Sequence, residues 1–125
     1  PDLIAERSAP RGVRHLGFVS TADLRALYSG AVATVYLSSY EGFGLPPFES
    51  LACGTPVVAT RVGAIDEHLG KRACFVSSDA DGGELAAAVA SAIADFAAGP
   101  YTARLSWSAT AAQTAVVYRN LGAEV

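Results

Sequence analysis

The residues best suited to chemistry lie between Ser38 and Gly54, in the stretch SSYEGFGLPPFESLACG. Two carboxylates, Glu41 and Glu49, stand eight positions apart in it. The tripeptide Gly42–Gly44 contains two residues without a Cβ atom, so its backbone can approach a ligand closely. A helix that begins near Pro46 would direct free N–H groups and the positive end of its dipole toward this turn. The pattern therefore predicts a site that holds phosphate on backbone amides.

The two carboxylates need a different role, because each would repel a bound phosphate. Both can accept hydrogen bonds from sugar hydroxyls, as the acidic residue of dinucleotide-binding folds does for a ribose. We expect Glu49 in the first turn of the helix, where its carboxylate would reach the same crevice as Glu41. A ligand with sugars on either side of a diphosphate, a nucleotide sugar, fits this arrangement. An acidic residue near a helix start also complements the dipole without any ligand, so Glu49 alone leaves a structural role open.

The elements that must position these residues alternate between short apolar runs and longer helical ones. The run 32–38 is rich in β-branched residues and is typical of a strand buried on both faces. Thr21 suits a helix N-cap, and Val116, Val117 and Tyr118 suit packing positions of the last helix. We expect strands over 14–20, 32–38, 55–60 and 73–77, and helices over 21–30, 46–53, 65–69, 81–96 and 108–121.

This alternation predicts an α/β fold, a Rossmann-like parallel sheet with helices on both faces. Ligands of such sheets bind at the carboxyl ends of the strands, near a topological switch point. In the doubly wound order 3-2-1-4-5-6, a third strand over 14–20 would not touch the strand over 32–38. The segment 38–54 begins at the carboxyl end of the strand over 32–38. This places the candidate site at the edge of the sheet where ligands are expected to bind.

Composition narrows the possible functions. The chain has 125 residues, of which 51% are hydrophobic and 17% charged, and this excludes disorder. The net charge of -3 argues against nucleic acid as a partner. No apolar run reaches the roughly 18 residues of a membrane span, and the first ten residues lack the order of a signal peptide, so we expect a cytoplasmic location.

The residues give no indication of a metal site. The two cysteines, Cys53 and Cys74, have no neighbouring ligands at zinc spacing, and we expect them to be buried, reduced thiols. Asp79 and Asp81 flank one alanine, but Asp81 is better placed to cap the alanine-rich helix that follows. We expect Trp107 to pack against a crossing helix, and no metal to be bound.

The sequence EGFGLPPFE followed by LACGTPVVAT resembles a known family. Glu41–Glu49 matches the E-x7-E motif of retaining glycosyltransferases of the two-Rossmann-domain (GT-B) architecture, specifically family four, also called group 1. The resemblance covers nearly the whole chain, includes Trp107 with its following helix, and is to the carboxyl-terminal, donor-binding domain of that family. Residues 1–125 would then form part of that domain, without its first strand–helix unit and without the amino-terminal acceptor domain.

The resemblance implies a role for each matching residue. Glu49 would bind the ribose hydroxyls of the donor nucleotide, and Glu41 would contact the donor hexose near the transferred carbon as the catalytic carboxylate. The backbone amides that hold the donor sugar and its β-phosphate would be those of Gly42, Phe43, Gly44 and Leu45. The loop that contacts the base would be formed by Phe18, Val19 and Ser20. Core packing is the equal alternative for Phe18 and Val19.

The resemblance also implies what the whole protein does. It would transfer a mannose- or glucose-type hexose from a nucleoside-diphosphate sugar to a hydroxyl acceptor, with retention and without a metal cofactor. The acceptor, a glycan or a lipid, would bind through the amino-terminal domain, and the parent protein could attach peripherally to the inner face of the membrane. The alternative is a catalytically inactive module or scaffold that binds nucleotide sugars.

One feature of the family's pattern is missing from this chain. The family holds the donor diphosphate with an Arg and a Lys five positions later, and no such pair occurs here. Losing one group that stabilises the departing charge typically costs about 100- to 1,000-fold in rate. We therefore expect negligible transferase activity from these 125 residues alone, and association through the exposed edge of their sheet.

Overall fold

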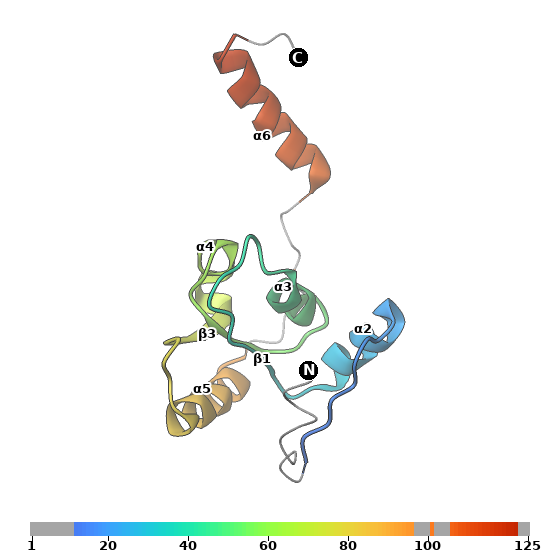
Figure 1. Ribbon diagram of the computed structural model, residues 1–125, viewed down its shortest axis with the longest axis vertical. Helices are drawn as coiled ribbons and strands as arrows, with labels where there is room; N and C mark the ends of the chain where they lie inside the picture. Colours follow the sequence, from blue (N-terminus) through green and yellow to red (C-terminus); the bar gives the residue numbers. More distant parts are fainter. Residues whose placement is uncertain (1–11, 97–100, 102–105, 123–125) are drawn as a thin grey trace.

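The computed structural model describes residues 12–96, 101 and 106–122, which form an α/β fold (Figure 1). Three strands lie in the order β1-β2-β3, and both pairs are parallel. The elements in chain order are α2 (Thr21–Gly30), β1 (Thr34–Tyr36), α3 (Leu45–Ala52), β2 (Val57–Thr60), α4 (Ala64–Leu69), the 3-10 turn η1 (Gly70–Arg72), β3 (Ala73–Val76), α5 (Gly82–Ala94) and α6 (Trp107–Asn120).

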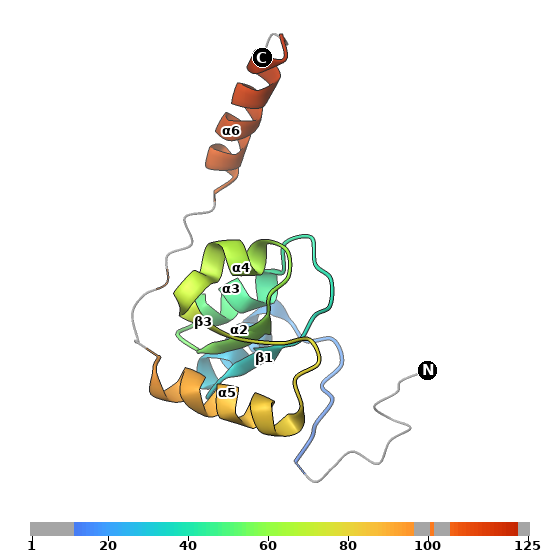
Figure 2. The same cartoon turned by 90° about the vertical axis from the view of Figure 1, so that its left-hand side faces the viewer.

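Helices cover both faces of this sheet, as the alternation of elements predicts. Figure 2 shows α3 and α4 on one face and α5 on the other, and α2 packs beside α3. Helix α6 extends away from the remaining elements in both views (Figures 1 and 2). The strand order agrees with the later half of a doubly wound sheet, in which consecutive strands are neighbours.

The core is built around β2, whose four residues are all buried. Val57 and Ala59 face the layer formed by α3 and α4, because alternate residues of a strand share one face. They pack there with buried side chains of those helices, namely Phe48, Leu51, Ile65 and Leu69. Because α3 packs on this central strand, the packing fixes where α3 begins relative to the sheet, and with it the position of the predicted site.

Ile65 is the largest fully buried side chain of this core, with 0% of its surface exposed. Ile65→Ala should lower the free energy of unfolding by about 2–5 kcal/mol, because it removes buried methyl groups and leaves a cavity. Urea denaturation followed by circular dichroism measures the change. Ile93→Ala on α5 is the control, because Ile93 is 46% exposed and its truncation should cost much less. Equal losses in the two variants would contradict this account of the core.

Two predictions about the first elements are wrong. Residues 14–20 form no strand. A strand needs a ladder partner, and the doubly wound order places this segment beside a second strand that the described residues do not supply. Ser20, rather than Thr21, caps α2: its Oγ accepts a hydrogen bond from the Asp23 N–H at 3.2 Å.

The run 32–38 forms a shorter and more exposed strand than predicted. Only Thr34–Tyr36 is in β1, and Val35 is 43% exposed. Within the described residues β1 pairs with β2 alone, so its outer edge has no neighbour. Helix α5 packs mainly on β2 and β3, which leaves the Val35 face of β1 uncovered. Association through an open sheet edge of this kind stays a prediction.

The elements near the carboxyl end give mixed results. The Asp81 carboxylate accepts hydrogen bonds from the Gly83 and Glu84 N–H groups, each at 2.8 Å, so Asp81 caps α5 as predicted. Packing of α6 was predicted wrongly: no residue of it is buried, and Trp107 is 90% exposed. The two free cysteines are half-buried rather than buried.

Candidate functional site

The candidate site begins where β1 ends. Tyr36 is the last residue of the strand, and its phenol donates a hydrogen bond to Oε1 of Glu41, which is half-buried. This bond raises the pKa of Tyr36 to about 12, and burial and the charge of Glu41 add to the shift. The Glu41 carboxylate is therefore held in one orientation at the carboxyl end of the sheet.

The raised pKa of Tyr36 makes this contact measurable. The folded state holds the phenol proton more tightly than the unfolded state, whose pKa is near 10.0. The contribution of this bond to stability is thus complete below pH 10 and is lost as the pH rises through about 12. In a titration followed by tyrosinate absorbance, Tyr36→Phe should remove a phenol that ionises late. Tyr118→Phe on α6 should retain it, and an unchanged late phase in Tyr36→Phe would contradict the contact.

Glu49 occupies a different environment. Helix α3 begins at Leu45, so Glu49 is its fifth residue and lies in the second turn rather than in the predicted first turn. Its side chain is exposed. It lies beside Tyr28 of α2, whose pKa is raised first by burial, then by the charges of Glu49 and Cys53 and by a hydrogen bond to Glu49. Each carboxylate of the pair therefore has a tyrosine next to it.

Buried hydroxyl groups tie α3 to its neighbours. Ser50, next to Glu49, is 0% exposed, and its Oγ donates to Oγ1 of Thr34 at 2.8 Å and to the carbonyl of Thr55 at 3.2 Å. The Thr55 hydroxyl donates in turn to the Tyr28 carbonyl at 2.5 Å. Since buried polar groups are costly when unpaired, this network fixes α3 against β1 and α2.

The turn before α3 requires glycine at Gly44. Its φ of 78° is in the left-handed region, and a Cβ atom there would lie 2.7 Å from Cδ1 of Ile65. Gly63 also packs closely against this loop, since a Cβ atom added to it would lie 2.7 Å from the carbonyl oxygen of Glu41. The loop between β2 and α4 therefore packs directly against the backbone that carries Glu41.

The start of α3 offers fewer donors than a typical helix. Pro46 and Pro47 are its second and third residues, and proline has no N–H. The helix start therefore has fewer free N–H groups than one without proline. The amides that remain for an anion are those of the preceding turn and of Leu45, while the dipole is unchanged. Leu45 and Gly42 are exposed, whereas Gly44 is buried.

The side chain of Phe43 is half-buried and packs against the core. Its ring stacks on Phe48 with centroids 5.0 Å apart and lies 5.8 Å from the ring of His68. Phe43 therefore anchors the turn through its ring.

The segment predicted to contact the base lies before α2. Phe18 is 99% exposed, which rules out core packing for it, and Val19 is half-buried. The Ser20 hydroxyl is engaged with Asp23 as the helix cap, donating to the carboxylate at 2.7 Å. A contact of these residues with a nucleotide base stays a prediction.

Sequence reasoning missed Tyr36 and Tyr28, the partners of the two carboxylates. A signal was available for Tyr36, because its phenol sits in an otherwise apolar run and a phenol in such surroundings usually finds a hydrogen-bond partner. Tyr28 gave no such signal, since its approach to Glu49 depends on how α2 packs against α3.

Comparison with known proteins places the chain in a family. The profile described as "Glycosyl transferases group 1" matches residues 2–114. The chain belongs to the group 1 glycosyltransferases. The three-stranded parallel sheet with helices on both faces agrees with the carboxyl-terminal GT-B domain of this family.

Several curated glycosyltransferases resemble the chain. It is 41% identical over 116 residues to D-inositol 3-phosphate glycosyltransferase 2 of Catenulispora acidiphila, a match covering 85% of the chain and 27% of that protein. It is 34% identical over 134 residues to the MMP alpha-(1->4)-mannosyltransferase of Mycolicibacterium hassiacum, covering 98% and 33%. It is 46% identical over 68 residues to O-antigen chain mannosyltransferase B of Escherichia coli, covering 54% and 18%.

The chain thus spans a third or less of the length of these relatives. No solved structure matches it significantly. Within the described ranges, no helix combines the length and the apolar character needed to cross a bilayer. The same ranges contain no group of three or more His, Cys, Asp or Glu side chains that could hold a metal ion.

Proposed function

We propose that this chain is the donor-binding domain of a retaining hexosyltransferase, and that its ligand is a nucleoside-diphosphate sugar with a mannose- or glucose-type hexose. The observation that carries the proposal is the pairing of Glu41 and Glu49 around the turn that opens α3. Glu41 lies just beyond the carboxyl end of β1, where ligands of parallel sheets bind. Membership in the group 1 glycosyltransferases and the names of the relatives support the same assignment.

Each carboxylate has a distinct task in this proposal. Glu49, exposed on α3, accepts hydrogen bonds from the ribose hydroxyls of the donor. Glu41, held by Tyr36, contacts the hexose near the carbon that is transferred. A fixed carboxylate is useful there, because a group already oriented toward the reacting atoms costs no reorganisation when the reaction occurs. Tyr36 is thus a positioning residue for Glu41.

In this proposal the backbone of the turn binds the phosphates of the donor. The amides of Gly42–Leu45 and the positive end of α3 would stabilise the negative charge of the leaving diphosphate. No metal is needed for that stabilisation, and we propose a metal-independent reaction. Transfer to an acceptor hydroxyl, a glycan's or a lipid's, would depend on parts of a longer protein that bind the acceptor.

A hollow also lies at the carboxyl edge of the sheet, next to the donor site and not lined by Glu41 or Glu49. It encloses about 470 Å³ and is lined by residues at or after the carboxyl ends of the strands, including Ser39, Thr60 and Ser77. This volume lies within the roughly 300–1,000 Å³ usual for small-molecule sites. Arg61 borders it, stacks 4.2 Å above the Phe75 ring and pairs with Asp66, so one cation is held in a defined place there.

Calorimetric titration of the chain with UDP-, GDP- and ADP-linked glucose and mannose tests the proposal. We expect binding of sugars on one base and weaker or absent binding on the other two. A chain that is folded by circular dichroism and binds none of the six would contradict the proposal. Binding without turnover by a complete protein that contains this chain would favour the alternative, an inactive module that binds nucleotide sugars.

A further inference from the structure

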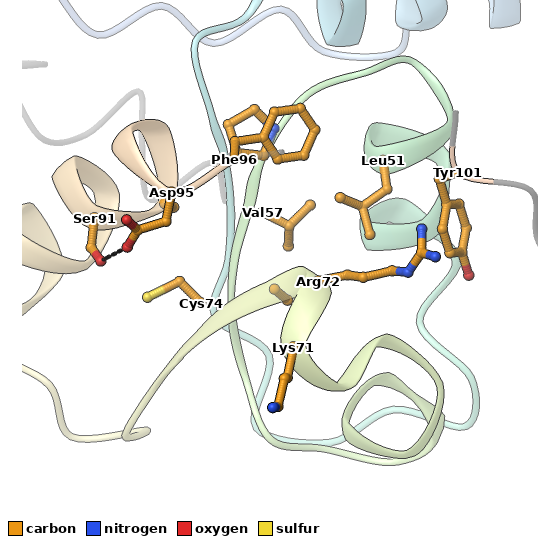
Figure 3. Close-up of a pocket in the computed structure, with 12 residues that line it drawn as sticks. Leu51, Val57, Lys71, Arg72, Cys74, Ser91, Asp95, Phe96 and Tyr101 are labelled. Atoms are coloured by element: carbon orange, nitrogen blue, oxygen red, sulfur yellow. Dashed lines mark hydrogen bonds between the residues drawn. The ribbon is translucent and has the colours of Figure 1, made fainter. Parts of the chain in front are cut away.

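A second cavity lies at the opposite edge of the sheet from Glu41. It encloses about 480 Å³, within the roughly 300–1,000 Å³ of small-molecule sites. Val57 and Ala73, the first residues of β2 and β3, line it, so it opens at the amino ends of the strands (Figure 3). Neither carboxylate of the donor site takes part in it. The cavity is therefore a separate place on the same domain.

The floor of this cavity is apolar and fixed in shape. Leu51 and Val57 are 3% and 1% exposed and belong to the packed core. The rings of Phe96 and Tyr101 form two of its walls, and both pack partly against that core. Aromatic walls on a rigid apolar floor favour a flat, apolar ligand body.

One wall of the cavity is positively charged. The Arg72 guanidinium lies 5.3 Å from the centroid of the Tyr101 ring, and in Figure 3 it points along that wall while Lys71 extends away from the ring. Among the described residues, neither Arg72 nor Lys71 forms an ion pair. A guanidinium stacked on an aromatic ring keeps its N–H edge free for a carboxylate or a phosphate.

Another wall of the cavity is polar, and a hydrogen bond orients its carboxylate. The Asp95 carboxylate accepts a hydrogen bond from the Ser91 hydroxyl at 2.9 Å (Figure 3), and Cys74 lines the cavity as well. A negative charge on this wall would repel a second anionic group. The ligand that fits carries its negative charge at one end only, at the Arg72 end.

We propose that this cavity binds a small aromatic anion, with its ring between Phe96 and Tyr101 and its anionic group on Arg72. The assignment is independent of the donor site, because it uses none of the residues at the carboxyl ends of the strands. It predicts that both parts of the ligand are required, the ring for the apolar floor and the charge for the guanidinium.

The two cysteines allow a test within one molecule. Cys74 lines the cavity, whereas Cys53 lies outside it and serves as the internal reference. Phenyl phosphate should slow the alkylation of Cys74 by iodoacetamide and leave that of Cys53 unchanged, as measured by mass spectrometry of the peptides. Phenol alone and inorganic phosphate alone should protect Cys74 much less at equal concentration.

Substitution of Arg72 tests whether its guanidinium holds the anionic group. Arg72→Gln should raise the half-protecting concentration of phenyl phosphate about tenfold or more, since it removes a charged hydrogen-bonding partner. Arg119→Gln on α6 makes the same charge change elsewhere and should have no effect, and Glu49→Ala should retain protection. The proposal is overturned if Cys74 is not protected, if Cys53 is protected equally, or if Arg72→Gln, shown to be folded, protects as the unchanged chain does.

Discussion

Glu49→Ala should raise the dissociation constant for a nucleotide sugar at the proposed donor site by about 10- to 100-fold. Hydrogen bonds to a charged group are worth about 1.5–3 kcal/mol, and each 1.4 kcal/mol is tenfold in affinity. Glu49 is exposed, and alanine is a good helix former, so the fold should survive the change. Calorimetric titration of both proteins with the preferred nucleotide sugar gives the ratio directly.

The control for this result is Glu67→Ala. Glu67 is an exposed glutamate of α4, so its removal makes the same change in net charge at another helix. It should leave the affinity within about twofold, since surface changes outside a site typically have effects within ±0.5 kcal/mol. An equal loss in the two variants would point to a general electrostatic effect. An unchanged affinity in Glu49→Ala would assign that carboxylate to the helix surface alone.

Local patterns predicted most of the fold. The apolar strand over 55–60, the helix stop at Gly54 and the cap at Asp81 depend on residues close together in sequence, and all three are present. The predictions that failed depend on partners. Residues 14–20 have the composition of a strand but no ladder neighbour among the described residues, and α6 has apolar side chains but no buried ones.

In the candidate site, too, the residues could be predicted from local patterns, whereas their contacts could not. The motif around Glu41 and Glu49 could be found from spacing and residue type alone. Its geometry could not, because Tyr36 reaches Glu41 across a turn and Tyr28 reaches Glu49 from another helix. The sequence also suggested that Gly44 allows a ligand to approach, whereas the structure adds a second reason, the side chain of Ile65 beneath it.

This second reason leads to the largest stability change expected at the site. Gly44→Ala should lower the free energy of unfolding by about 2–5 kcal/mol. A residue with a Cβ in the left-handed region costs roughly 1–2 kcal/mol, and forcing an extra methyl group into a packed core costs about 1–3 more. Urea denaturation measures the loss. The same variant should weaken nucleotide-sugar binding, because the turn between Glu41 and α3 must shift.

Gly42→Ala is the matched control for this change. A Cβ at Gly42 meets no atom within 4 Å, and its φ is not in the left-handed region. This substitution should be neutral or stabilise the chain by up to about 1 kcal/mol, since alanine restricts the unfolded chain. If Gly44→Ala were as mild as Gly42→Ala, the close packing of the turn on Ile65 would be contradicted.

A double variant separates the two causes. Ile65→Ala removes both the Cδ1 and the Cγ1 atoms that lie 2.7 Å and 2.9 Å from the added Cβ, so it should relieve the clash but not the backbone strain. Gly44→Ala combined with Ile65→Ala should therefore lose less stability than the sum of the two single losses, with a coupling of about 0.5–3 kcal/mol. The loss that Gly44→Ala causes in the Ile65→Ala background measures the strain of the turn. Additive losses would mean that strain alone requires glycine at position 44.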